Sequence, residues 1–463
     1  MNNQAKIIFA NDARIQANKQ WTQYIEHHTN DFCTLFTYGQ LFVAVKEIKE
    51  QSQSNDKVRM IAGSIARELS KHKVEKASVV GEELEKAFST LTKEQVITAF
   101  VEGWNLGTYN YVTYRSDQSP VSTELTIEGN QDYDSFIKAG KNRAEAVAFS
   151  RDLMNDIPSA LHPQTFPERL EEEFNGTDVD VKTFTKEDLE KMEMNGVLTV
   201  GQGSEHEPTF VEMTYQGNPD KPLVALVGKG VTFDTGGISL KRGRHLSDMR
   251  MDMGGAAAVA GAMKLLAASQ ADVNVVGLIP MVENMPDSTA VLPGDVIRYK
   301  NGHTVQIGNT DAEGRLILAD GIIRAGELEA NYIVDIATLT GAIVAALGSK
   351  MAGVFGDEQL SLAMKKLGDE NGDFNWPMPL VDAYESYLKS DYADVNNVSS
   401  KSEAGSITAG LFLRRFVPEG SKWIHVDMAG VMESNEEGYY AKSATGYGAR
   451  LLADFAHYVA NER

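Results

Sequence analysis

Hydrophobic and polar residues follow two different patterns along the chain, and the change occurs near residue 145. Before it, short β-rich runs such as Ser78 to Val80 and Asn110 to Arg115 predict strands. Charged segments with apolar residues at helical spacing, such as Ser54 to Lys71 and Lys93 to Tyr109, predict helices between them. We therefore expect an N-terminal α/β domain over residues 1–137.

The segment Lys138 to Asn155 has apolar residues at helical spacing and ends before Pro158 and Pro163. Proline ends helices because it lacks a backbone N–H and clashes with the preceding turn. We interpret residues 138–160 as a linker helix and residues 161–463 as the C-terminal domain.

Beyond the linker, apolar runs are followed by glycine-containing turns and helical patterns. The predicted strands and helices are Leu223 to Val227, Ala256 to Ala268, Val273 to Pro280, Tyr332 to Ala337, Gly341 to Leu347 and Trp423 to Met428. Strands that alternate with helices predict a mostly parallel sheet covered on both faces, an α/β/α fold. Ligands of such sheets usually collect at the carboxyl ends of the strands, so we expect the chemistry in this half.

Composition narrows the class of partner. The chain has 463 residues and a formal net charge of −21, which disfavours nucleic acid and anionic membranes as main partners. The most apolar stretch, Asn331 to Gly348, contains Asp335 and is shorter than a membrane span. The lone cysteine, Cys33, and a start without a secretory signal pattern predict a cytoplasmic protein.

The common catalytic motifs HExxH, GxSxG, GxxxxGK[ST] and GxGxxG after a strand are missing from the sequence. Charged residues in apolar, glycine-rich surroundings stand out instead, because an unpaired buried charge is costly. The run LVALVGKGVTFDTGGISLK contains Lys229, Asp234 and Lys241. Two simpler explanations stay open: Lys229 extends to the surface, and Asp234 only stabilises the DTGG turn.

Two further runs have the same character. In SDMRMDMGGAAAVAGAMKLLA, Asp252 directly precedes a Gly/Ala helix, where it is either a site residue or an ordinary N-cap. In IGNTDAEGRLILADGI, Asp311, Glu313 and Arg315 occupy alternating positions, which predicts one face of a short extended segment. A salt-bridged surface turn is the alternative for this run.

Four carboxylates in one cleft need compensating positive charge. Two carboxylates about 4 Å apart repel by about 4 kcal/mol at an effective dielectric constant near 20. Two divalent metal ions would balance Asp234, Asp252, Asp311 and Glu313, and paired metal ions suit hydrolysis of a carbonyl group. An aspartic protease is a poor alternative, because its dyad needs two matched aspartates and the chain has one DTG.

The strings VGKGVTFDTGGISLK, MRMDMGG, NTDAEGRL, DIATLTGA and WIHVDMAG occur in this order. Together they resemble the leucyl aminopeptidase (cytosol aminopeptidase) family of dinuclear zinc exopeptidases. The resemblance covers about residue 145 to the C-terminus. It implies a metal-dependent aminopeptidase that removes leucine-like residues from short peptides with a free N-terminus, using a metal-bridging water.

The resemblance also implies roles for individual residues. Asp234 and Glu313 would bridge two metal ions, Zn²⁺ or Mn²⁺; Lys229 and Asp252 would complete the tighter site, and Asp311 the exchangeable one. Lys241 would act as an electrophile, and Arg315 would hold a bicarbonate-like anion that serves as the base. The substrate pocket would contain Met249, Thr338, Leu339 and Gly341.

By the same resemblance we expect a macro-like N-terminal domain and a cytoplasmic homohexamer with interior active sites. The chain departs from the family in its linker, NDIPSALHP, and in Arg242 to Ser247, which is more basic than the usual spacer. We expect His245 of that segment to face the cleft. A regulatory DNA-binding scaffold is the alternative from another class, and the charge of −21 argues against it.

Overall fold

The computed structural model describes residues 4–462 apart from 38, 117–121, 130, 244–245, 435–436 and 441. Two compact units divide the chain. The first contains Met1–Ala148 with the short segments Glu370–Gly372 and Ser434–Ser443. The second contains Phe149–Asp369, Asp373–Glu433 and Ala444–Arg463.

The first unit is built on a sheet whose five described strands have the order β2-β3-β1-β4-β5. Strand β2 is antiparallel to β3, and the other pairs are parallel. Helices α3 and α5 pack on one face, where they share an apolar core with the strands. The strands are β1 (Gln4–Phe9), β2 (Phe32–Thr37), β3 (Gln40–Val45), β4 (Lys76–Val80) and β5 (Glu124–Glu128), and the helices are α1 (Ala13–Gln16), α2 (Lys19–His27), α3 (Asn55–Lys71), α4 (Gly81–Ala87) and α5 (Lys93–Thr108).

Two of the elements expected near this unit differ from the structure. The strand expected at Asn110 to Arg115 is wrong: the segment is coil and turn, and the Tyr114 side chain is 54% exposed. The preference of such residues for strands comes from packing against neighbouring strands, and no described strand pairs with this segment. The helix expected from Lys138 is α6 (Asp134–Asn155), which begins four residues earlier.

The second unit contains a sheet with nine described strands, in the order β15-β14-β17-β13-β8-β10-β7-β6 with β9 paired to β10. The central neighbours β17, β13, β8 and β10 are parallel, which confirms the mostly parallel sheet. The strands are β6 (Val179–Phe184), β7 (Thr209–Gln216), β8 (Leu223–Gly228), β9 (Gly230–Asp234), β10 (Asn274–Asn284), β13 (Tyr332–Ala337), β14 (Ala352–Gly356), β15 (Asn375–Pro377) and β17 (Lys422–Asp427). A separate small sheet joins β11 (Val296–Arg298), β12 (Thr304–Gln306) and β16 (Val395–Asn396).

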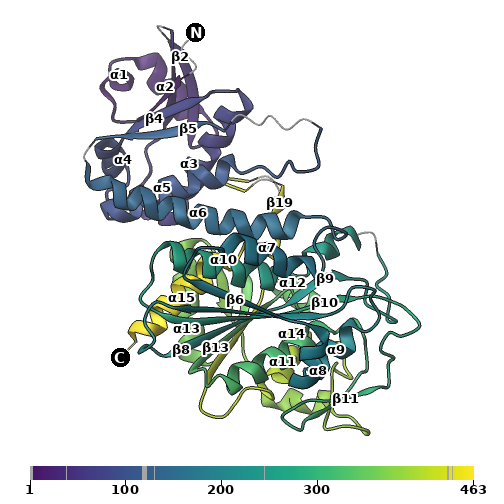
Figure 1. Cartoon of the computed structure of the whole chain (residues 1–463). Coiled ribbons are helices and arrows are strands. Elements are labelled where there is room, and N and C mark those ends of the chain that lie inside the picture. The colour runs from purple at the N-terminus through teal and green to yellow at the C-terminus, as the bar shows by residue number, and fades with distance from the viewer. Residues whose placement is uncertain are drawn as a thin grey trace. The chain divides into compact units, whose positions relative to one another are not determined.

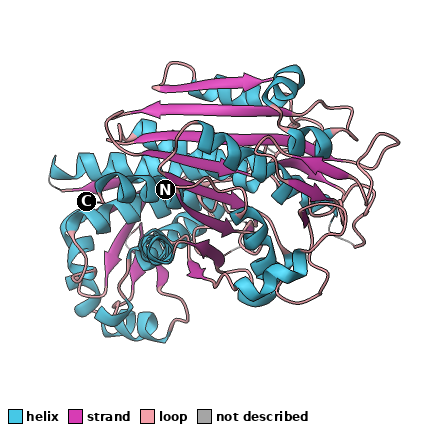
Figure 2. Cartoon of the chain, turned by 90° about the horizontal axis from the view of Figure 1, so that it is seen from below, coloured by secondary structure: helices cyan, strands magenta, loops and turns pink. Residues whose placement is uncertain are grey.

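Helices cover both faces of the large sheet, with α10 and α15 on one side and α11 and α14 on the other (Figure 1). Figure 2 shows the strands changing direction progressively, the ordinary twist of such sheets. The helices are α7 (Thr165–Phe174), α8 (Lys186–Met192), α9 (Asn195–Gly201), α10 (Gly254–Ala268), α11 (Gly314–Glu327), α12 (Gly341–Leu347), α13 (Glu358–Asn371), α14 (Gly405–Arg414) and α15 (Ala449–Asn461).

Helix α10 approaches the sheet unusually closely at its first turn. A Cβ at Gly255 would lie 2.1 Å from the Ile336 carbonyl oxygen and 2.7 Å from the Lys229 backbone nitrogen, so only glycine fits. The N–H of Ala256 donates to the Lys229 carbonyl at 2.9 Å. This close approach brings Asp252, two residues before the helix, to the end of strand β8.

Candidate functional site

The predicted site residues of the second unit converge at the carboxyl ends of its parallel strands. Lys229 lies between β8 and β9, Asp234 ends β9, and Asp252 precedes α10. Glu313 directly precedes α11, which follows the small sheet. Carboxylate oxygens of Asp234, Asp252 and Glu313 all lie within 4.8 Å of one another, and all three residues are buried.

Lys229 lies at the centre of this cluster. Its Nζ is 2.7 Å from Asp252 Oδ2 and 2.9 Å from Glu313 Oε1, and it donates to the Thr338 carbonyl at 3.0 Å. The side chain is only 3% exposed, so Lys229 does not extend to the surface. Gly314 makes room for it, because a Cβ there would lie 2.7–2.8 Å from the lysine side chain.

Asp234 both stabilises its turn and belongs to the cluster. Its Oδ1 accepts hydrogen bonds from the Gly236 N–H and the Asn284 side-chain amide, both at 2.8 Å. Its Oδ2 lies 2.7 Å from Nζ of Lys241, which also pairs with Asp311. Asp234 therefore stabilises the DTGG turn and also belongs to the cluster.

Asp252 is not the N-cap of α10. The N-cap position is Met253, and no side chain caps the helix there. The Asp252 carboxylate instead contacts Lys229 and accepts a hydrogen bond from Thr338 Oγ1 at 2.7 Å. Its position before a glycine-rich helix thus directs it into the cluster.

The extended segment expected at Asp311 to Arg315 is wrong. Residues 308–312 form loop and turn, and Glu313 has helical backbone angles at the start of α11. The loop is held from outside by the Asn397 side chain, whose Oδ1 accepts from the Gly308 N–H at 2.8 Å and whose Nδ2 donates to the Asn309 carbonyl at 2.8 Å. These bonds replace the partner strand that an extended segment would need.

Arg315 is buried directly behind Glu313. Its Nη1 donates to the Asn397 carbonyl at 2.9 Å, whereas its buried Nε makes no hydrogen bond within the described residues. Burial lowers the pKa of Arg315 to about 10, although Glu313 acts in the opposite direction. Part of the guanidinium is thus free to bind an anion.

The pKa values of the three buried carboxyl groups reflect both their burial and the negative charge of their neighbours. Burial raises the pKa of Asp252 to about 8, and burial together with Glu313 raises that of Asp234 to about 6. Burial opposes ionisation of Glu313 too, but Lys229 and Lys241 hold its pKa below the usual value. Glu313 Oε2 is buried and makes no hydrogen bond within the described residues. A set of oxygen donors with a spare lone pair and excess negative charge fits a divalent metal ion.

Comparison with known proteins agrees with this geometry. The pattern of the cytosol aminopeptidase family, catalytic domain, matches residues 148–453. A probable cytosol aminopeptidase of Rickettsia bellii (strain OSU 85-389) is 36% identical, and the match covers 98% of this chain and 96% of the relative. Another, from Nocardia farcinica (strain IFM 10152), is 42% identical over 77% of this chain and 72% of the relative. The chain belongs to the cytosol aminopeptidase family.

Membership of this family indicates an aminopeptidase, a hydrolase that depends on metal ions. Among solved structures, the bottromycin maturation enzyme BotP in complex with Mn is similar throughout, with a TM-score of 0.89 and 29% identity over 99% of both chains. This likeness extends over the N-terminal unit, where the sequence motifs are weak.

The expected pocket residues lie around the same strand ends. Thr338 and Leu339 directly follow β13, Gly341 begins α12, and Met249 lies in a short 3₁₀ helix, Leu246–Met251, before Asp252. A Cβ at Gly341 would meet open space, whereas Thr338 contacts Lys229 and Asp252. His245, which was expected to face the cleft, lies outside the described residues.

Sequence reasoning missed the polar residues that support this cluster. Asn284 donates to Asp234 at 2.8 Å and to the Thr310 carbonyl at 3.0 Å. Asn397 supports the loop that carries Asp311, and Asp427 supports the turn after β13. Asp427 lies inside the quoted WIHVDMAG string, and a buried acid that ends an apolar strand is the signal that could have singled it out.

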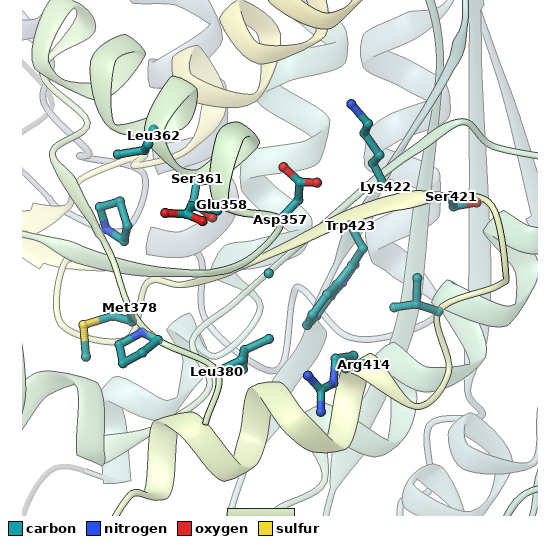
Figure 3. Close-up of a pocket in the computed structure, with 14 residues that line it drawn as sticks. Asp357, Glu358, Ser361, Leu362, Met378, Leu380, Arg414, Ser421, Lys422 and Trp423 are labelled. Carbon is teal, nitrogen blue, oxygen red and sulfur yellow. The ribbon is translucent and has the colours of Figure 1, made fainter. Parts of the chain in front are cut away.

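A separate hollow of about 790 Å³ lies at the other end of β17, beside Lys422 and Trp423 (Figure 3). Its Arg414 donates to Asp382 and Glu385 at 2.8 and 2.9 Å, so this cation is already neutralised. The hollow contains none of the predicted site residues. The chemistry therefore belongs to the carboxyl ends of the strands.

Proposed function

We propose that this chain is a leucyl aminopeptidase that hydrolyses the first peptide bond of short peptides with a free N-terminus. The observation that carries the proposal is the buried cluster of Asp234, Asp252 and Glu313, whose oxygens lie within 4.8 Å of one another. Buried carboxylates at this spacing stay ionised at neutral pH only with compensating cations. Without a bound metal ion, Lys229 and Lys241 supply part of that charge.

We assign two divalent ions, Zn²⁺ or Mn²⁺, to this cluster. Asp234 and Glu313 would be shared between them. Lys229, as the neutral amine, and Asp252 would complete one site, and Asp311 the other. When bound, such ions would polarise the substrate carbonyl and activate a water molecule for attack. The similar BotP enzyme is a complex with Mn, which supports a divalent ion in this fold.

Two cations of the chain support the reaction. Lys241 is 26% exposed, so its ammonium can reach a substrate and stabilise the negative charge that develops on the carbonyl oxygen. Arg315 carries a buried Nε without a hydrogen bond, and its planar guanidinium suits a bidentate anion such as bicarbonate. Such an anion would accept the proton of the attacking water.

The pocket residues favour an apolar first residue. Met249 and Leu339 offer apolar surface, and the open space at Gly341 leaves room for a branched side chain. A difference of one methylene changes the preference by only about 1–3 kcal/mol, so we expect graded selectivity for leucine-like residues. The Thr338 hydroxyl donates to Asp252, so this side chain is held beside the cluster.

We further propose a homohexamer in the cytoplasm that acts on peptides. No helix of the described residues has the length and apolarity that crossing a bilayer requires. The relatives from Rickettsia bellii and Nocardia farcinica are named as probable cytosol aminopeptidases, which supports this location. Sedimentation of the purified protein tests the assembly.

The decisive experiment measures release of leucine from a chromogenic leucine amide before and after chelation. We expect activity to disappear with the metal and to return with Mn²⁺ or Zn²⁺. Asp252→Asn should abolish both metal binding and activity. Asp320→Asn is the matched control, because Asp320 is also a buried carboxyl group but does not belong to the cluster of possible metal ligands. Full activity of metal-free protein, or an active Asp252→Asn variant, would refute the proposal.

A further inference from the structure

A buried carboxylate outside the cluster organises the turn that carries two contacts to it. Asp427 is the last residue of β17 and is fully buried. Its Oδ2 accepts from Thr340 Oγ1 at 2.6 Å. Its Oδ1 accepts from the backbone N–H groups of Leu339 and Thr340 at 3.2 and 3.3 Å. Three donors of one turn thus converge on one side chain.

That turn joins β13 to α12 and touches the cluster at its other end. The Thr338 carbonyl accepts from Lys229 Nζ at 3.0 Å, and Thr338 Oγ1 donates to Asp252 Oδ1 at 2.7 Å. Thr340 is also the N-cap of α12, since its Oγ1 accepts from the Ile343 N–H at 3.1 Å. A change at Thr340 therefore reaches Lys229 and Asp252 through only two residues of backbone.

The strand that carries Asp427 is itself fixed against β13. Asp335 of β13 accepts from Trp423 Nε1 at 2.6 Å and lies 2.5 Å from His425 Nδ1. Residues Asp427 and Ala337 are paired in register, and the Met428 N–H donates to the Ala337 carbonyl at 2.8 Å. The backbone of Asp427 is therefore fixed relative to the end of β13.

We propose that Asp427 is a positioning residue for the metal ligands Lys229 and Asp252, acting through the turn of residues 338–340. The inference rests on the proposed metal-dependent function. Asp427 touches no member of the cluster in the hydrogen bonds and ion pairs of the described residues, so its effect is indirect. Partners that orient metal ligands typically change metal affinity or activity by about 10- to 100-fold when removed.

The test compares Mn²⁺ binding to metal-free protein by calorimetry with steady-state kinetics. Thr340→Val removes the hydroxyl that links Asp427 to the turn, and Asp427→Asn weakens the same link from the other side. We expect each variant to bind Mn²⁺ about 10- to 100-fold more weakly than wild type. Because both variants disturb the Thr340–Asp427 hydrogen bond, their effects should not add, and the double variant should be little weaker than the weaker single variant.

Two further variants separate positioning from general loss of structure. Thr340→Ser keeps the hydroxyl and should bind Mn²⁺ at least about tenfold more tightly than Thr340→Val. Thr408→Val is the matched control: Thr408 is 1% exposed and donates to the Gly405 carbonyl at 3.1 Å on α14. It should lose stability without losing Mn²⁺ affinity.

The outcomes distinguish this inference from the proposed function. Wild-type protein that is active with metal, together with unchanged Mn²⁺ affinity in Thr340→Val and Asp427→Asn, would overturn the positioning role alone. Equal loss of affinity in Thr408→Val would overturn it as well, because the effect would then be unspecific. Wild-type protein without metal-dependent activity would refute the proposed function itself.

Discussion

The loop that carries Asp311 depends on a single buried amide. Asn397 is fully buried, and its Oδ1 accepts from the N–H groups of Gly308 and Asn309 at 2.8 and 3.3 Å. Its Nδ2 donates to the carbonyls of Asn309 and Ala312 at 2.8 and 3.3 Å. The substitution Asn397→Asp keeps both acceptor bonds and the shape, but removes both donor bonds.

The expected cost follows from these four bonds. Two buried carbonyls lose their donors, at about 1–3 kcal/mol each. The two N–H groups then bind a charged acceptor and regain about 1 kcal/mol each, which leaves a net loss of about 0–4 kcal/mol in the free energy of unfolding. The introduced carboxylate also repels the carbonyls of Asn309 and Ala312 and displaces the loop that carries Asp311. We therefore expect Mn²⁺ affinity to fall about 10- to 100-fold.

The chain offers a matched control for this change at Asn375. It is also fully buried, and its Nδ2 donates to the carbonyls of Met364 and Asp373 at 3.0 and 3.2 Å. Asn375 lies on the short strand β15 at one end of the strand order, away from the cluster. Asn375 Oδ1 makes no hydrogen bond within the described residues, so Asn375→Asp gains no charged acceptor bond and should destabilise the protein at least as much as Asn397→Asp. It should leave the Mn²⁺ affinity of the folded molecules unchanged.

Both variants are measured by urea unfolding, Mn²⁺ calorimetry and hydrolysis of a leucine amide at a temperature where each is folded. We expect Asn375→Asp to lose at least as much stability as Asn397→Asp, but only Asn397→Asp to lose Mn²⁺ affinity and kcat/KM. If Asn397→Asp binds Mn²⁺ like wild type, or if both variants lose kcat/KM equally, the loop does not depend on this amide in the way described.

Three other groups give predictions that are checked separately. Burial raises the pKa of Asp320 to about 8, so the wild-type free energy of unfolding should fall as pH rises from about 4 to 8. Urea unfolding should show Asp320→Asn gaining about 3 kcal/mol over wild type between pH 5 and 7, and a constant difference would contradict this. Gly314→Ala places a Cβ 2.7 Å from the Lys229 side chain, and calorimetry should show at least about tenfold weaker Mn²⁺ binding. Lys241→Met should lower kcat about 100-fold with little change in KM, and an unchanged kcat would exclude its proposed role.

The arrangement of the second unit could be predicted because its strands are buried on both faces. Runs such as Leu223 to Val227 and Tyr332 to Ala337 are apolar without alternation, and both are buried strands here. The polar residues after such strands meet because parallel strands end at one edge of the sheet. This geometry explains why separate motifs predicted one cluster.

The wrong expectation at Asp311 to Arg315 and the alternatives left open at Asp252 have a common cause. Asp311 to Arg315 alternates like a strand, and Asp252 precedes a helix as an N-cap would, yet neither pattern includes distant partners. Glu313 and Asp252 are instead fixed by Lys229, which lies 84 and 23 positions away in the sequence. Local propensity is a weak guide where a buried ion pair decides the conformation.

The supporting residues could not be predicted, because their roles arise only in three dimensions. Asn397 bonds to residues 85 to 89 positions earlier in the chain, and Asp427 bonds to residues 87 and 88 positions earlier. Nothing in the spacing of DVNN or WIHVDMAG indicates which backbone groups these side chains reach. Long-range hydrogen bonds of this kind leave no periodic trace.

Charge balance links the separate observations at the site. The carboxylates of Asp234, Asp252, Asp311 and Glu313 would carry four negative charges, and Lys229 and Lys241 return two positive ones. Burial, with a smaller contribution from the neighbouring carboxylates, raises the pKa values of Asp234 and Asp252, whereas Lys229 and Lys241 hold the pKa of Glu313 below its usual value. Four carboxylates beside two ammonium groups, with Glu313 Oε2 making no hydrogen bond within the described residues, support the proposed divalent cation in this cluster.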